Sequence, residues 1–304
     1  MQIGQQDAEI GTTQIRRLLM PPRSSPTARR RRLANALRQL REEHGLSCAE
    51  LGRRLGWSEA KVSRIETARV GVKADDLDRL LEHFQVPEDL KEKLMLLRKQ
   101  AGHRGWWHSY TDAFPLWFHN YVGLEDGARS LITYQNQLIH GLLQTDDYAN
   151  AVIRAHQPAI GPEEIDRQLT ARATRRATLT RTDPLIYWAI LDEAVLHRVV
   201  GSADIMRAQL THLRQMAALP NVTLQVLPFN AGAHASMGTS FNIMKFPDAG
   251  DPDIVYIEDL TTSQYLEEPH DIERYTVVID HLRASALSPE ASDSLIARFA
   301  DDMT

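Results

Sequence analysis

The segment from Leu46 to Glu66, LSCAELGRRLGWSEAKVSRIE, constrains the fold of this 304-residue chain more than any other. Ser47 with Glu50 three residues later is the signature of a capping box, so a helix begins there, and Gly56 ends it. Ser58 caps a second helix. Two helices joined by so short a turn must pack against each other around one small core. The apolar residues predicted to face that core are Leu51, Leu55, Val62 and Ile65.

Similar signals around this segment predict five short helices between Arg30 and Gln100. Gly45 ends the first helix, a residue at or near Asp75 opens the fourth, and Pro87 stands at the start of the fifth. We therefore expect an all-α helix-turn-helix domain over residues 29–104. Apolar residues at helical spacing supply the rest of its core: Leu33, Ala36, Leu37, Leu40, Leu77, Leu80, Leu81, Phe84, Leu90, Leu94 and Leu97.

The sequence outside this domain divides into three parts. Residues 1–28 are polar and proline-interrupted, which predicts a flexible arm with at most a short helix near 15–20. Residues 105–123 form an aromatic linker, and 124–304 are expected to form a mixed α/β domain. Its expected helices cover 124–155, 162–180, 203–218, 271–286 and 289–301, and its expected strands cover 185–191, 222–228, 239–246 and 253–258.

Charge is distributed unevenly along the chain. Residues 1–105 hold 21 Lys and Arg against 14 Asp and Glu, whereas residues 106–304 hold 14 against 26. A basic module on an acidic body is compatible with DNA binding, because the local field governs the approach of a polyanion. The run Arg29–Arg32 would lie along DNA phosphates, remain solvated, or solubilise the start of a helix.

The second helix of the segment, about Ser58–Ala68, is the expected recognition helix in the major groove of duplex DNA. Glu66 is instead expected to pair within the domain, with Arg38 or Arg41. Lys and Arg can read guanine edges, and Ser and Glu can reach other edges or phosphates. The predicted base-facing residues are Ser58, Glu59, Lys61, Ser63 and Arg64, and the predicted flanking backbone contacts are Arg53, Arg54 and Arg69.

These residues resemble the xenobiotic-response-element class of helix-turn-helix repressors. The resemblance rests on Leu46, Glu50, Leu51, Leu55, Gly56, Trp57-Ser58, Val62-Ser63 and Ile65-Glu66. The chain departs from the class at Gly52, where alanine is usual, and at Thr67-Ala68, where asparagine-glycine usually turns the chain.

The remainder resembles the WhiJ-like regulators of actinobacteria, through Gly141–Thr145, Leu191–Leu196, Gln209-Leu210, Val226–Phe229 and Ala231–His234. His140 stands where that family usually has proline. The resemblance implies a regulator with a small BldB-like partner. The alternative is an antitoxin-like protein whose main act is to sequester that partner, with DNA binding serving autoregulation. Candidate partner or ligand residues are Leu142, Leu143, Gln144, Tyr148, Phe229 and His234, although each also suits a core or turn position.

No catalytic, metal or cofactor site is expected. Asp192, Glu193 and His197 are close enough to bind a metal or share a proton, but Asp192 is better explained as a helix cap. Cys48 suits a small buried position. Without a membrane-length apolar run or a signal segment, we expect a cytoplasmic protein, nucleoid-associated when bound to DNA. A homodimer is expected, because two recognition helices read two half-sites.

Overall fold

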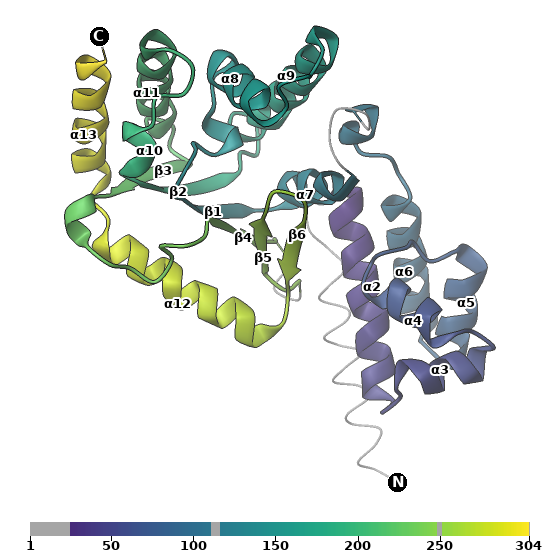
Figure 1. The fold of residues 1–304 in the computed structure, drawn as a ribbon. Coiled ribbons are helices and arrows are strands. Elements are labelled where there is room, and N and C mark those ends of the chain that lie inside the picture. Colours follow the sequence, from purple (N-terminus) through teal and green to yellow (C-terminus); the bar gives the residue numbers. More distant parts are fainter. Residues whose placement is uncertain (1–24, 111–115, 248–250, 304) are drawn as a thin grey trace. The chain divides into compact units, whose positions relative to one another are not determined.

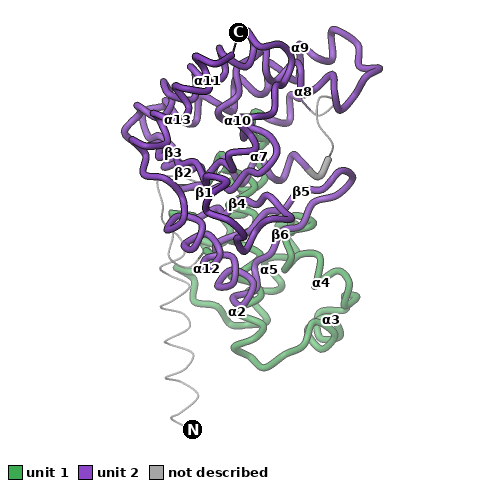
Figure 2. The backbone as a smooth tube through the Cα atoms, turned by 60° about the vertical axis from the view of Figure 1, so that its left-hand side comes forward, with its two compact units in different colours: residues 1–106, 126–128, 246–252 green, residues 107–125, 129–245, 253–304 purple. Residues whose placement is uncertain are grey.

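A computed structural model describes residues 25–110, 116–247 and 251–303. These residues form two compact units, coloured separately in Figure 2. Unit 1 contains the described residues up to Trp106, with 126–128 and the described part of 246–252, and unit 2 contains the rest. The predicted arm lies outside the described residues as far as residue 24. Across the described ranges, no helix has the length and apolarity needed to cross a bilayer.

Unit 1 is built from the five predicted helices (Figure 1). They are α2 (Pro26–Glu43), α3 (Cys48–Leu55), α4 (Glu59–Glu66), α5 (Ala74–His83) and α6 (Glu88–Ala101). The Ser47–Glu50 capping box is present, Gly56 ends α3 in the left-handed conformation, and Ser58 caps α4. The predicted core is confirmed, because every helix buries a side chain at 2% exposure or less. Examples are Leu37, Leu51, Val62, Leu77 and Leu94.

A buried ion pair joins α2 to α4. The Arg41 guanidinium donates to both carboxylate oxygens of Glu66, with N–O distances of 2.8 to 2.9 Å, and its Nη1 donates to the Leu46 carbonyl at 2.7 Å. The hydrogen bond to Glu66 raises the pKa of Arg41. The prediction that Glu66 pairs within the domain is confirmed for Arg41, whereas Arg38 pairs with Glu42. The last turn of α4 is therefore tied to α2.

Cys48 is only half-buried, contrary to the expectation of a fully buried position. Its Sγ lies 3.7 Å from a Glu66 oxygen, so the thiol packs beside the Arg41–Glu66 pair. Burial and the Glu66 charge raise the pKa of Cys48, which keeps it a neutral thiol.

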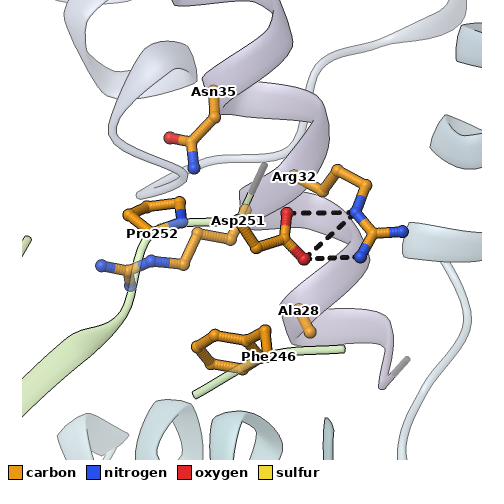
Figure 3. Close-up of a pocket in the computed structure, with 7 residues that line it drawn as sticks. Ala28, Arg32, Asn35, Phe246, Asp251 and Pro252 are labelled. Carbon is orange, nitrogen blue, oxygen red and sulfur yellow. Dashed lines mark hydrogen bonds and ion pairs between the residues drawn. The ribbon is translucent and has the colours of Figure 1, made fainter. Parts of the chain in front are cut away.

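The arginines of the Arg29–Arg32 run lie within α2, which begins three residues earlier at Pro26. Figure 3 shows the Arg32 guanidinium facing the Asp251 carboxylate, where Nε donates to both oxygens at 3.1 and 3.2 Å. Arg32 is 3% exposed. The expectation that it would meet phosphate or solvent is therefore wrong, because Asp251, which belongs to the same unit, supplies a carboxylate. The neighbouring pocket holds only about 10 Å³, the space of one water molecule.

Unit 2 contains a six-stranded mixed sheet in the order β3-β2-β1-β4-β5-β6 (Figure 1). The strands are β1 (Ser130–Gln135), β2 (Ile186–Asp192), β3 (Val222–Leu227), β4 (Phe241–Lys245), β5 (Ile254–Glu258) and β6 (Ser263–Leu266). β1, β2 and β3 are parallel, and each later pair is antiparallel. Ile132 of β1 lies opposite Trp188 and Ile243, so β1 occupies the centre of the sheet.

Helices cover both faces of the sheet. α12 (Pro269–Ser285) packs Ile279 and Leu282 against one face, while α8 (Asp146–His156), α11 (Ala203–Ala217) and α13 (Pro289–Asp302) lie over the other (Figure 1). The connections from β1 to β2 and from β2 to β3 both join parallel neighbours and move in the same direction across the sheet. Because such connections are usually right-handed, their helices lie on the same face. The remaining elements are α7 (Leu116–Gly127), α9 (Pro162–Arg176), α10 (Ala194–His197), and 3-10 turns η1 (Trp106–Tyr110), η2 (Gly141–Leu143), η3 (Ala177–Leu179) and η4 (Phe229–Ala231).

Two strands were not expected. The predicted helix over 124–155 is wrong at β1, where residues 131–134 are all buried. A strand covered on both faces loses the alternation that would identify it, and its apolar residues then also fit a helical spacing. β6 is short and half-exposed, so its pattern carries little signal.

His140 begins the η2 turn. Its Nδ1 accepts from Leu142 N at 3.4 Å, which caps η2, and its Nε2 lies 3.0 Å from the Tyr121 hydroxyl. Because Nδ1 accepts, the neutral ring carries its proton on Nε2. Burial, with the charges of Arg175 and Arg172, lowers the pKa of His140 to about 3. The ring is therefore neutral in the folded protein.

Replacing Glu66 with alanine should lower the free energy of unfolding by about 3 to 5 kcal/mol, because the Arg41 charge would remain buried without its partner. Denaturant unfolding followed by circular dichroism measures the change. Lys93→Ala is the control, because its exposed ion pair with Asp89 contributes less than about 1 kcal/mol and does not involve Arg41. Equal losses in the two variants would contradict the structural role of the buried pair.

Stability should also fall as pH drops below about 6.5, the ordinary pKa of histidine. The unfolded chain then binds a proton at residue 140 that the folded chain rejects until pH approaches 3. Between pH 6.5 and 5, His140→Asn should remove a slope of up to about 1.4 kcal/mol per pH unit from the free energy of unfolding. The exposed-residue control His270→Asn should keep that slope, and an unchanged slope in His140→Asn would refute the assignment.

Candidate nucleic-acid interface

The helix α3 packs very closely against the turn that leads into α4. A Cβ added to Gly52 of α3 would lie 2.8 Å from the Trp57 carbonyl oxygen and 3.4 Å from Glu59 N. Glycine at 52, where the class usually has alanine, lets α3 touch the turn that leads into α4. Gly56 supplies that turn at φ +69°, a conformation that favours glycine.

The outer face of α4 contains most of the predicted DNA-contacting residues. Val62, Ile65 and Glu66 face inward, which leaves the opposite side of the helix exposed. Ser58 also accepts from Lys61 N at 3.2 Å, so its hydroxyl caps the helix. The exposed predicted residues are Ser58, Glu59, Ser63 and Arg64 on or before α4, and Arg53, Arg54 and Arg69 beside it. Arg53 and Arg54 lie in the last turn of α3 and Arg69 follows α4.

Lys61 differs from the other predicted contacts. Its Nζ lies 2.8 Å from Asp76 of α5 and 4.0 Å from the centre of the Trp57 ring, so the ammonium forms an ion pair and a cation–π contact within unit 1. Sequence reasoning missed both partners: Asp76 lies on another helix, and Trp57, four residues before Lys61, precedes the start of α4 at Glu59. Arg64, on the outer face of α4, has an exposed side chain.

The turn after α4 is formed without glycine. Ala68 has φ +55°, a left-handed conformation in which a Cβ is disfavoured. Val70 N nevertheless donates to the Arg64 carbonyl at 3.2 Å and closes the helix end. The departure from asparagine-glycine therefore keeps the turn and adds local strain.

The six candidate partner or ligand residues of unit 2 do not form one site. Leu142, Leu143 and Tyr148 have no exposed area and belong to the core. Gln144 lines a cavity. Phe229 is 57% exposed and stacks on His197. His234 lies beside Asp192, the last residue of β2.

His234 belongs to a small polar cluster with Tyr134 and Asp192. The Tyr134 hydroxyl donates to Asp192 Oδ2 at 3.1 Å and lies 3.3 Å from His234 Nε2. Burial and the Asp192 charge raise the pKa of Tyr134, so the phenol stays protonated. The N-cap of α10 is Glu193, so the expectation that Asp192 occupies this position is wrong by one residue. Asp192 Oδ1 nevertheless accepts from Ala194 N, the first residue of α10, at 2.9 Å.

Glu193 and His197 lie apart from this cluster, joined by a contact of 3.4 Å between Oε1 and Nε2. Glu193 also accepts from Phe229 N at 2.7 Å. Within the described ranges, no three His, Cys, Asp or Glu side chains come close enough to hold a metal ion.

Comparison with protein families agrees with this division of the chain. Residues 32–94 match a helix-turn-helix domain, so unit 1 contains a DNA-binding domain of that class. Residues 118–298 match a domain of unknown function, DUF5753. The chain therefore belongs to the family of proteins that carry this domain. No curated protein and no solved structure matches it.

Ala68→Gly should raise the free energy of unfolding of unit 1 by about 1 kcal/mol, because glycine adopts the left-handed conformation without strain. Ala60→Gly, on the exposed side of α4 with ordinary helical geometry, should lower it by up to about 1 kcal/mol. Both changes are measurable by urea unfolding. A loss of stability in Ala68→Gly would show that the turn is not strained.

Proposed function

We propose that this protein is a sequence-specific transcription regulator in which α4 enters the major groove of duplex DNA. The observation that carries the proposal is the exposed face of α4, with Ser63 and Arg64 outward on a helix fixed from behind by the Arg41–Glu66 pair. A rigid helix with outward polar side chains can hold them against base edges. The excess of basic residues in the first 105 positions favours the same surface.

The residues of this surface have separate proposed roles. Arg64 reads a guanine edge, and Ser58, Glu59 and Ser63 contact other base edges or phosphates. Arg53, Arg54 and Arg69 position the domain on the phosphate backbone. Lys61 contributes first through its contacts with Trp57 and Asp76, which orient α4, and contacts DNA only after leaving Asp76.

Unit 2 is proposed to control DNA occupancy by binding a partner or ligand, without turnover. We propose a homodimer, because two copies of α4 related by a two-fold axis would read two half-sites. A small BldB-like protein is the proposed protein partner. Repression is the proposed outcome, by analogy with the repressors that unit 1 resembles.

The test is binding of the full chain to promoter DNA of its own gene and neighbouring genes, against scrambled duplex, over a salt series. Arg64→Ala should weaken specific binding about tenfold or more without loss of thermal stability, because one base contact is worth about 1 to 3 kcal/mol. Lys61→Ala should instead lower stability. Lys93→Ala, an exposed lysine of α6, is the control and should change neither.

Affinity for the preferred promoter should fall steeply as salt rises, because phosphate contacts release counterions. If no promoter is preferred over scrambled DNA, the proposed function is wrong. If Arg64→Ala binds like the unchanged protein, α4 is not the reading element.

A further inference from the structure

Unit 2 contains a cavity of about 850 Å³ that is open to solvent and in the size range of sites for small organic molecules. Its walls come from the segment after β1, the residues before and at the start of β4, the turn between β5 and β6, and helices α7, α8 and α9. β1 and β5 end at this edge of the sheet, and β4 and β6 begin there, as their pairing requires.

The cavity lies where the chain reverses its path across the sheet. From β1 the chain proceeds to β2 and β3 on one side, and it then returns to the other side of β1 as β4. In open parallel α/β sheets, ligands bind beyond the carboxyl ends of strands at such a reversal of strand order. Here β4 is antiparallel to β1, so the cavity lies beside the carboxyl end of β1 and the amino end of β4.

Arg172 of α9 lines this cavity, and among the described residues no carboxylate accepts a hydrogen bond from its guanidinium. Its Nη1 donates to the uncharged Gln144 side chain at 3.1 Å, and its Nε is buried without a hydrogen-bond partner among the described residues. Arg175, one turn later, is held by Glu125 through bonds of 2.8 and 2.9 Å. Burial and the Arg175 charge lower the pKa of Arg172 to about 10, so the guanidinium remains charged near neutral pH.

The other groups around Arg172 leave room for an anion. A Cβ on Gly141 would lie 3.3 Å from Arg172 Nη1, so glycine at this position lets the guanidinium pack closely against the η2 turn. His140 is neutral, and Tyr121 keeps its proton because burial raises its pKa. The carboxylates of Glu258 and Asp259 also line the cavity and are exposed. The Glu258 charge, with that of Glu125, favours the charged form of Arg172, but among the described residues neither lining carboxylate accepts a hydrogen bond from it.

The rest of the lining suits a polar organic body larger than a simple ion. Aromatic rings of Phe118 and Tyr256 form part of the wall. Gln135 donates to Asn242, and Asn242 donates to the Tyr121 hydroxyl, so this part of the wall has fixed hydrogen-bonding groups. Further carboxamide groups come from Asn136, Gln137, Gln144, Gln168 and Gln264.

We propose that this cavity binds a small organic acid whose carboxylate or phosphate group pairs with the Arg172 guanidinium. A guanidinium offers parallel N–H donors that match an oxyanion, and Arg172 lines the cavity with a buried Nε that has no hydrogen-bond partner among the described residues. The inference rests on the proposed function in that the acid would be the ligand through which unit 2 controls DNA occupancy.

The experiment titrates the full chain at low salt with inorganic phosphate, acetate, glucose 6-phosphate and gluconate, with glucose as the uncharged control. Nuclear magnetic resonance follows the Arg172 Nε–H signal and the backbone amides of Gln144 and Asn242, and thermal unfolding follows stability. The anions should shift these signals saturably at or below about 50 mM, and glucose should not. Stronger binding of the phosphate pair or of the carboxylate pair identifies the acid group.

Arg172→Gln should weaken anion binding about tenfold or more, as loss of a charge-assisted bidentate contact requires. Its stability without anion should equal or exceed that of the unchanged protein, because an unneutralised buried charge is removed. Arg167→Gln, an exposed position on the same helix, should bind anions normally. Absence of saturable shifts with all four anions, or equal binding by Arg172→Gln, would overturn the inference.

The same samples separate this inference from the proposed function. Promoter binding with no saturable anion binding would leave the regulator intact and remove the acid site. Anion binding lost in Arg172→Gln, with no promoter preferred over scrambled DNA, would establish the site and remove the regulatory role.

Discussion

The buried pair of Arg41 and Glu66 sets the geometry of unit 1. A charge removed from water is tolerated only when its partners are placed to within hydrogen-bond distance, so the pair fixes the last turn of α4 against α2. The Leu46 carbonyl accepts from the same guanidinium, which also locates the chain just before α3. The Arg41 side chain thereby fixes the positions of α2, α4 and the start of α3 relative to one another. The side of α4 opposite Glu66 is left facing outward.

The surface of α4 shows how one helix divides its residues between support and exposure. Val62 and Ile65 enter the core, and Glu66 completes the ion pair. Lys61 lies between the two sides, where Trp57 and Asp76 hold its ammonium. Arg64 is left outward, and an arginine suits guanine recognition because its donors are parallel and planar.

Unit 2 follows a different principle, in which strand order creates a site and side chains give it character. The switch at β1 opens space at one edge of the sheet. Two arginines on consecutive turns of α9 then differ in their hydrogen-bond partners. Arg175 pairs with the Glu125 carboxylate, whereas Arg172 donates to the Gln144 carboxamide. The spacing of Arg172, Arg175 and Arg176 gave a signal in the sequence, but a basic helix face is usually a solvated one.

The sequence alone determined the helices of unit 1, their caps and their core, because capping and helical periodicity are local and act within a few residues. It also placed four of the six strands and the pairing of Glu66. Only the tertiary structure decided that residues 130–135 are a central strand, that Arg32 meets Asp251, and that Lys61 meets Asp76. Those outcomes depend on segments distant in sequence, and burial on both faces removes the periodicity by which a strand is recognised.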